Sequence, residues 1–376
     1  MSARPHRARV GASGHYRQVS IALVTTFLSD YRLPLYRLLA ERHGLEVLCY
    51  GRGDRYAPPW FRDLDAQLAA ADFPARRLEG IGEALRLGLR YDAVIAPFAG
   101  GSMLPAAYAG AKRYGKPFVL WASVWHQPRS LVHGLTLPVT RHIYRHADAV
   151  IAYGEHVRRF VAAIRGRDDD VFVAPQAVEE LFGRAVTDAE VRAFRDRHEL
   201  GDGPLVLYVG RVVAEKGADV LRAAAPLVHP HATVVVVGNT PPDAPESPMR
   251  WLGPLPRADL PVAYRAAELT VVPSIPTPRF KEPWGLVCNE AMEQGRPVVA
   301  TTAVGAVAGG LVRDGESGLV VAPGDPIALA GAVNRLLDDR PLREALGAGA
   351  RTAVAPYTYE AMADGIGRAL AAAGAH

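Results

Sequence analysis

Cysteine and long apolar runs are both scarce in this chain of 376 residues. The two cysteines, Cys49 and Cys288, each lie inside an apolar stretch, so we predict that both are reduced and buried rather than joined in a disulfide. Two cysteines without neighbouring paired ligands also disfavour a zinc site. No apolar run approaches the ~20 residues that a membrane span needs, which argues against a transmembrane protein.

The first 18 residues, "MSARPHRARVGASGHYRQ", lack the apolar centre of a secretory signal peptide. We therefore predict a basic disordered tail over 1–18 and a cytoplasmic protein. The alternative is that this tail contacts anionic lipid at the inner face of a membrane. The formal net charge of +4 favours an anionic partner, such as a nucleotide or a phosphate.

Short apolar runs alternate with longer helical stretches along the chain. The runs are nearly continuous, which is typical of parallel strands covered on both faces. They lie at 19–27, 45–51, 91–98, 117–124, 147–154, 170–176, 204–210, 231–238, 250–255, 268–274, 296–301 and 317–323. Repeated βαβ units predict an α/β protein with two Rossmann-like, doubly wound domains facing each other across a cleft.

The alternation pauses over 181–203, where the sequence is polar and charged and ends in glycines. We predict that this segment is a hinge between an amino-terminal domain, 19–180, and a carboxy-terminal domain, 204–355. A helix over 356–376 is expected to pack back on the amino-terminal domain. Ligands of doubly wound domains bind beyond the carboxyl ends of the strands, so chemistry is sought in the loops that follow strands.

One such loop carries two cations, Arg211 and Lys216, followed by Gly217 and an amphipathic helix. The amides and the dipole of a helix start favour anions, and the two cations neutralise charge, so this arrangement suits a diphosphate. It is not a Walker loop, because the G-x-x-x-x-G-K-[ST] order is missing. The alternative is that both cations are solvated loop charges.

A second loop holds Glu282 just before a helix that is expected to begin near Gly285, with Glu290 within that helix. A carboxylate accepts two hydrogen bonds from a vicinal diol, so two carboxylates at different depths are able to hold a sugar and a ribose. The alternative is that Glu282 complements the helix dipole and Glu290 is a surface charge.

At these residues the chain resembles a known family. Residues 204–330 resemble the donor-binding domain of retaining GT-B glycosyltransferases of glycosyltransferase family 4 (group 1). The matching pieces are "YVGRVVAEKG", "WLGPL", "EPWGLVCNE" with "AMEQGRPVVAT", and "VGAVAGGLVRDGESGLVVAPGD". The amino-terminal half resembles the family more loosely, through "YRLPLYRLLAERHGLEVLCYG" and "ADAVIAYGEHVRRF".

The resemblance implies that domain 204–355 binds a nucleotide-diphosphate sugar and that domain 19–180 binds an acceptor, whose hydroxyl receives the sugar with retention. It implies no metal and no other cofactor. Residue by residue, the catalytic set that it implies is Arg211, Lys216, Glu282 and His126. The donor-binding set that it implies is Arg211, Lys216, Glu282, Gly285, Leu286, Val287, Glu290, Gly253 and Leu255.

His126 follows a strand in "LWASVWHQPRS", where the family has a histidine near the reacting end of the sugar; a surface or structural histidine is the alternative. The same loop offers Trp125 and Arg129 as acceptor contacts. Many relatives carry a glycine pair after the first strand, but Tyr31 and Arg32 stand here instead, so the amino-terminal phosphate contact is in doubt. They are further acceptor candidates, and "FAGGSML" (98–104) offers backbone amides in place of the glycine pair.

Other classes of protein make different demands on the sequence. A metal-dependent GT-A enzyme needs a D-x-D at a strand end, whereas Asp63–Asp65 lies in an amphipathic helical stretch and Asp168–Asp170 in a charged turn. A periplasmic sugar-binding protein would share the paired Rossmann-like domains, but the absent export signal and the two glutamates with Arg211 and Lys216 argue against it. A GT-B-fold nucleotide-sugar epimerase stays an alternative; it would need catalytic acids and bases at the second carbon of the sugar. The acceptor is expected to be a glycan or lipid-linked saccharide of the cell envelope, another glycolipid or glycoconjugate, or a small natural product, and not a nucleic acid.

The stretch 131–147 is expected to be a half-buried helix, with a membrane-surface helix as the alternative.

Overall fold

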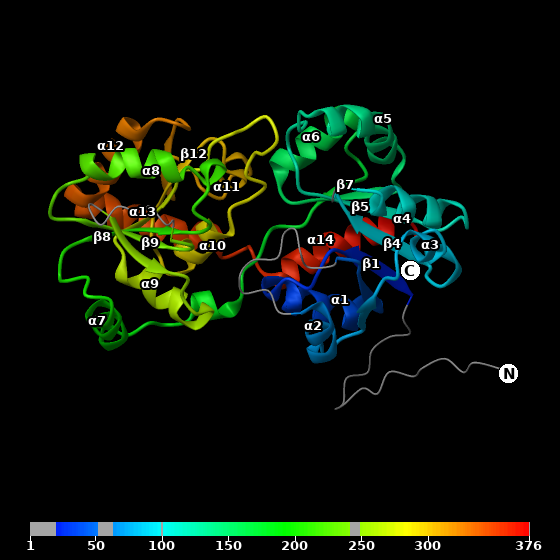
Figure 1. Cartoon of the computed structure of the whole chain (residues 1–376), viewed down its shortest axis with the longest axis horizontal. Helices are drawn as coiled ribbons and strands as arrows, with labels where there is room; N and C mark the ends of the chain where they lie inside the picture. The colour runs from blue at the N-terminus through cyan, green and yellow to red at the C-terminus, as the bar shows by residue number, and fades with distance from the viewer. Residues whose placement is uncertain (1–19, 52–62, 99–100, 241–248, 376) are drawn as a thin grey trace. The chain divides into compact units, whose positions relative to one another are not determined.

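The computed structural model describes residues 20–51, 63–98, 101–240 and 249–375 (Figure 1). It contains two sheets, and the predicted doubly wound α/β architecture is confirmed. The strand order is β3-β2-β1-β4-β5-β6-β7 in one sheet and β10-β9-β8-β11-β12-β13 in the other. β1 pairs in parallel with β2 and β4, and β8 pairs in parallel with β9 and β11. In each sheet the chain therefore starts in the middle and continues on both sides, which creates a crevice at the carboxyl ends of the central strands.

The strands of the seven-stranded sheet are β1 (Ile21–Thr25), β2 (Leu45–Cys49), β3 (Ala75–Arg77), β4 (Ala93–Pro97), β5 (Phe118–Ala122), β6 (Ala149–Ala152) and β7 (Val171–Val173). Those of the six-stranded sheet are β8 (Leu205–Val209), β9 (Thr233–Val237), β10 (Met249–Gly253), β11 (Leu269–Val272), β12 (Val298–Thr301) and β13 (Gly318–Val321). The helices are α1 (Leu33–His43), α2 (Leu64–Ala70), α3 (Ile81–Ala84), α4 (Met103–Lys112), α5 (Leu131–His146), α6 (Glu155–Arg165), α7 (Asp188–Arg197), α8 (Ala218–Ala224), α9 (Leu260–Ala266), α10 (Leu286–Glu293), α11 (Gly305–Ala308), α12 (Pro326–Asp338), α13 (Arg340–Val354) and α14 (Tyr359–Ala372).

The contacts divide the chain into two compact units. The first contains the residues up to Trp121, together with 142–151 and the chain from Ile366 onward; the second contains 122–141 and 152–365. α14 therefore begins in the second unit and ends in the first. The predicted domain boundaries stay a prediction, and the predicted tail over 1–18 lies outside the described residues.

The strands of the six-stranded sheet alternate between two apolar cores. Leu207, Val235 and Ala300 point into a core that α9 and α10 complete. Their neighbours Tyr208 and Val236 point into the opposite core, which is completed by α8 and α12, two helices that lie side by side in Figure 1. A strand buried on both faces needs apolar residues at every position, which explains the continuous runs in the sequence.

Local sequence features set the ends of the helices. Pro34 lies in the first turn of α1, and Gly44 follows that helix in the left-handed region at φ 61°. α7 begins with a capping box between Thr187 and Glu190. The segment 181–203, predicted as a hinge, thus contains a folded helix, and Phe194 of α7 is buried in the core of the second unit. Within the ranges that the structure describes, no helix combines the length and the apolar character that crossing a membrane requires.

Candidate active site

The loop after β8 places the two predicted cations differently. Lys216 ends a short 3₁₀ helix, Ala214–Lys216, and Gly217 follows at φ 76°. The side chain of Arg211 is 62% exposed and lies 3.8 Å from the Glu215 carboxylate. The Tyr208 hydroxyl donates a 2.7 Å hydrogen bond to the Arg211 carbonyl, which fixes the start of the loop. Arg211 therefore faces solvent, whereas Lys216 is directed inward.

Lys216 and Glu282 form an ion pair, in which the ammonium donates to Oε2 of the carboxylate. The Ser274 hydroxyl donates to the same oxygen at 3.2 Å. Glu282 is buried, with 5% of its surface exposed, so its charge is compensated by these two donors rather than by bulk water. The loops after β8 and β11 also share a backbone hydrogen bond of 3.1 Å from the amide of Ile275 to the Glu215 carbonyl.

α10 begins where the sequence predicted. Gly285 precedes it at φ 92°, and Leu286 and Val287 form its first turn. The first amides of a helix have no acceptor within that helix, so these are the groups that an anion or a sugar oxygen contacts most readily. Gly253, at φ 69°, ends β10 and accepts a 3.0 Å hydrogen bond from the amide of Gly238, and Leu255 packs against the core.

Glu290 is buried in α10, so the alternative that it is a surface charge is wrong. The hydroxyl of Tyr264, on α9, donates a 2.6 Å hydrogen bond to it. Burial raises the pKa of Glu290, and the Tyr264 hydrogen bond and the charge of Arg257 lower it again in part. Tyr264 and Arg257 were not found from the sequence, because neither residue type in an ordinary helical stretch signals a carboxylate partner.

The loop after β5 contacts the loop of Glu282 within the second unit. The indole N–H of Trp125 donates a 2.9 Å hydrogen bond to the Glu282 carbonyl, and the Lys281 ammonium lies 3.4 Å from the centroid of the Trp125 ring. Arg129, whose side chain was the predicted acceptor contact, donates its backbone amide to the Pro278 carbonyl at 2.7 Å. The structure thus joins Trp125 and Arg129 to the segment of the predicted donor site.

Both ring nitrogens of the neighbouring His126 are buried and, among the described residues, have no hydrogen-bond partner. Burial lowers the pKa of His126, and the positive charge of Lys281 and the nearby His133 lower it further. His126 is therefore neutral near pH 7 and has donor and acceptor capacity that the protein does not use. This arrangement suits a ring that forms a hydrogen bond with a hydroxyl of a bound ligand.

A second histidine at this site was not predicted. His156, at the start of α6, is buried and donates a 3.0 Å hydrogen bond from Nε2 to the Pro283 carbonyl. Its ring lies 5.2 Å from that of Trp125 and 5.8 Å from that of Trp284. Burial lowers its pKa to about 4. The one available signal was a histidine two residues after a glycine that follows a strand, in "AYGEH".

The two amino-terminal candidates lie in the first unit, in the 3₁₀ helix Asp30–Arg32. Arg32 is buried, and its guanidinium lies 4.6 Å from the ring centroid of Trp121 and 5.3 Å from that of Tyr31. This packing directs Arg32 into the unit. The acceptor role of both residues stays a prediction, and residues 99–100 of the "FAGGSML" stretch lie outside the described residues.

The two D-x-D strings serve local structure. Asp63 caps α2 by accepting from the amide of Asp65, which itself pairs with Arg77 at 2.7 Å. In the second string, Asp168 pairs with Arg158 at 2.8 Å, and Asp170 pairs with Arg165 and Arg167. Asp65, Asp168 and Asp170 are thus paired with arginines of the protein.

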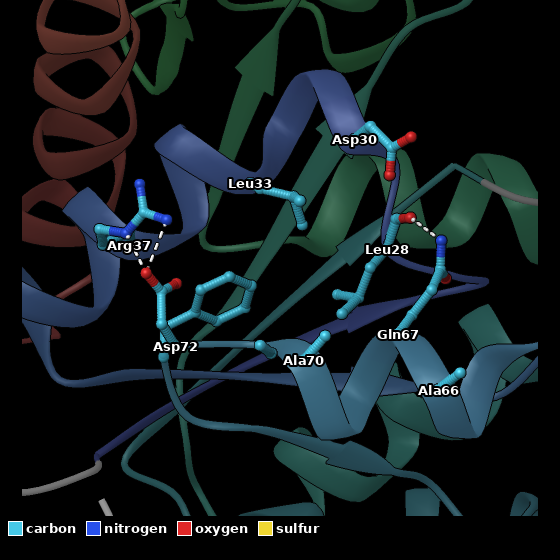
Figure 2. Close-up of a pocket in the computed structure, with 10 residues that line it drawn as sticks. Leu28, Asp30, Leu33, Arg37, Ala66, Gln67, Ala70 and Asp72 are labelled. Carbon is cyan, nitrogen blue, oxygen red and sulfur yellow. Dashed lines mark hydrogen bonds and ion pairs between the residues drawn. The ribbon is translucent and has the colours of Figure 1, made fainter. Parts of the chain in front are cut away.

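The first unit contains a pocket of ≈ 440 Å³ between α1 and α2 (Figure 2). Leu28 and Leu33 give it an apolar lining, and the ion pair between Arg37 and Asp72, at 2.7 Å, closes one end. At the other end Gln67 donates to the Leu28 carbonyl at 3.0 Å, while its Oε1 is buried and without a partner within the described chain. The pocket therefore offers room for an apolar group.

Comparisons with known proteins bear on the family and the fold. Residues 203–339 match the family model described as "Glycosyl transferases group 1". The chain is 32% identical to a D-inositol 3-phosphate glycosyltransferase of Stackebrandtia nassauensis, over 69% of this chain and 63% of that protein. It is 32% identical to an alpha-D-kanosaminyltransferase of Streptomyces kanamyceticus, over 63% of this chain and 64% of that protein. The chain thus spans less than two thirds of the length of these relatives.

The fold is that of a solved structure, Anabaena Alr3699/HepE in complex with UDP and glucose. The TM-score is 0.74 at 19% identity, over 94% of this chain and 100% of that one. At this identity the likeness speaks for the fold alone, and the predicted GT-B fold is confirmed. Residues 203–339 therefore form a group 1 glycosyl transferase domain.

Proposed function

We propose that the chain is a retaining glycosyltransferase that moves a sugar from a nucleotide-diphosphate sugar to an acceptor hydroxyl without a metal ion. The observation that carries the proposal is the Lys216–Glu282 pair beside the start of α10. A partly buried cation, a buried carboxylate and the first amides of a helix lie together at the carboxyl ends of β8 and β11, where doubly wound domains bind nucleotides.

In this proposal the diphosphate competes with Glu282 for Lys216. The leaving group is an anion, and stabilising it is the largest contribution that the protein makes to such a transfer. That stabilisation comes from Lys216, from the exposed side chain of Arg211 and from the amides of Gly285, Leu286 and Val287. Glu282, released from Lys216, accepts hydrogen bonds from hydroxyls of the transferred sugar.

The remaining predicted residues complete the donor site. Glu290 accepts from the ribose hydroxyls, and the stretch Gly253–Leu255 borders the base. His126 contacts a hydroxyl near the reacting carbon, because its ring nitrogens are buried and unused within the described structure. Trp125 positions this histidine through its hydrogen bond to the Glu282 carbonyl.

The acceptor is proposed to belong to cell-envelope polysaccharide, glycolipid or glycoconjugate synthesis. An apolar part of such an acceptor fits the pocket between α1 and α2. The protein is proposed to be cytoplasmic, with peripheral contact at the inner face of a membrane through α5, where Leu135 is 83% exposed and Val139 49% exposed. The likeness to an alpha-D-kanosaminyltransferase supports a small natural product as the second candidate acceptor.

A thermal-shift screen of UDP-, GDP-, TDP- and ADP-sugars, and of the bare diphosphates, tests the donor site. A ligand that binds the folded state raises the melting temperature by mass action. We expect a rise with one nucleotide that persists in EDTA and is lost in Lys216→Ala. No rise with any of them at millimolar concentration would refute the donor assignment. An epimerase would convert the nucleotide sugar without an acceptor and without releasing free nucleotide diphosphate.

A further inference from the structure

A basic pocket lies at the amino ends of β11 and β12, opposite the ends at which Lys216 and Glu282 meet. Its volume is ≈ 720 Å³. Five of the residues that line it are arginines, namely Arg265, Arg296, Arg340, Arg343 and Arg351. The two sites lie at opposite ends of the strands, so this pocket is separate from the donor loops.

Three parts of the second unit build the pocket. α13 contributes one stripe of its surface, because Arg340, Arg343 and Arg351 are three and eight residues apart, which places them on one face of the helix. The end of α9 contributes Arg265, and the turn before β12 contributes Arg296. Arg343 is the best held of the lining arginines, since its guanidinium donates to the Leu336 carbonyl at 2.6 Å.

The acidic residues of the lining neutralise only two of the arginines. Glu268 pairs with Arg343 at 3.1 Å, and Glu344 pairs with Arg340 at 2.7 Å. Arg265, Arg296 and Arg351 are left in excess among the lining residues. The next carboxylate is that of Glu293, which is close enough to Arg351 for the two charges to interact.

Arg296 carries a buried polar atom that lacks a partner. Its guanidinium donates to the Arg265 carbonyl, and its Nε is buried and has no hydrogen-bond partner in the described chain. Burial and the charges of its arginine neighbours lower its pKa to about 10. A buried N–H without an acceptor is costly, and an anion in the pocket is able to supply the missing acceptor and to offset the repulsion.

We propose that this arginine-lined pocket binds the phosphate groups of a multiply charged ligand. Guanidinium groups match phosphate oxygens in a bidentate geometry, and several of them around one concave surface favour a ligand with more than one negative charge. The phosphates belong either to a soluble molecule or to a lipid headgroup, since both present the same chemistry to the pocket. The site does not depend on the proposed glycosyl transfer.

Isothermal titration with sodium tripolyphosphate tests the proposal, in a Lys216→Ala background that weakens binding at the donor loops. The pocket variant is Arg265→Gln with Arg351→Gln, because neither position is buried. The matched control is Arg313→Gln with Arg335→Gln, which removes the same charge from exposed positions elsewhere in the second unit. Melting temperatures of all variants verify that they are folded.

We expect the pocket variant to weaken tripolyphosphate binding by about tenfold or more, as the loss of a charge-assisted hydrogen bond does, and the control to leave it unchanged. Equal weakening in both variants, or no binding by the parent protein, would overturn the proposal. Sedimentation with phosphatidylcholine vesicles, with and without phosphatidic acid, separates the two sources. Vesicle binding that the pocket variant loses identifies a headgroup, whereas tripolyphosphate binding without it identifies a soluble ligand.

Discussion

Lys216 and Glu282 are 66 residues apart in the chain and form an ion pair that joins the loop after β8 to the loop after β11. The Glu282 side chain is 7% exposed and that of Lys216 is 24% exposed, so water compensates neither charge fully. Removing one partner of such a pair leaves the other buried and uncompensated, whereas removing both is much less costly. Stability and donor binding can therefore be separated by experiment.

Lys216→Met should lower the free energy of unfolding by roughly 1–3 kcal/mol, because Glu282 loses its cation. The double variant with Glu282→Gln should regain most of that loss, since no buried charge then remains. Neither variant should show a rise in melting temperature with the nucleotide that stabilises the parent protein. Urea unfolding and thermal shift measure the two effects. A double variant that regains the nucleotide response would show that the pair is structural only.

His126→Ala should lower the rate of sugar transfer by about 10²-fold or more, the usual effect of removing a group that acts on protons at the reacting centre. Its stability should change by less than about 1 kcal/mol, because the ring nitrogens make no hydrogen bond among the described residues. Release of nucleotide diphosphate in the presence of acceptor measures the rate. Exposed His231, replaced by alanine, is the control, and an equal rate in both variants would assign His126 a structural role.

His156 should make the stability of the protein depend on pH. Its pKa is about 4 in the folded protein and 6.5 as the ordinary value, so the unfolded chain takes up the proton first as the pH falls. The contribution of His156 is therefore fully present above pH 6.5 and is lost as the pH falls toward about 4; the loss is at most roughly 3 kcal/mol.

His156→Gln removes this titration and keeps an N–H that can donate to the Pro283 carbonyl. Melting temperatures measured between pH 6.5 and pH 4 should therefore fall less steeply in this variant than in the parent protein. The same change at His231, which is exposed, should leave the slope of the parent protein unaltered. Parallel slopes in all three proteins would mean that water reaches the His156 ring.

The sequence predicted those features of the site that depend on local pattern. The start of α10 at Gly285, the strands β8 and β11 and the glutamates within one segment all follow from apolar runs and turn residues. The strand β3, Ala75–Arg77, was not predicted, because three residues that include two arginines carry no apolar run. The short length of this strand at the sheet edge is what allows such a composition.

Partners from distant segments could not be predicted in the same way. That Tyr264 is the donor to Glu290, and Pro283 the acceptor for His156, depends on how helices and loops pack after the chain has folded. The seven residues between Glu282 and Glu290 indicated that the two carboxylates contact different parts of a ligand. The spacing did not indicate that both carboxylates are buried. A single sequence gives the periodicity of an element, whereas side-chain partners across elements are a property of the assembled core.

A substitution at Gly217 tests how closely the loop after β8 must approach the loop after β11. It lies at φ +76°, and a Cβ built on it would be 1.9 Å from the Pro273 carbonyl oxygen. Gly115 is a matched control, since it lies at φ +65° with nothing within 4 Å of the same added atom. Gly115→Ala should cost only the strain of a left-handed alanine, about 1 kcal/mol. Gly217→Ala should cost more, because the loop that carries Lys216 must also move away from β11.

That movement should separate Lys216 from Glu282, so Gly217→Ala should lose the nucleotide-induced rise in melting temperature while Gly115→Ala keeps it. Urea unfolding and the thermal-shift assay measure both effects in the same preparations. If Gly217→Ala were no less stable than Gly115→Ala and bound the nucleotide as well, the close approach of the two loops would not be what positions Lys216.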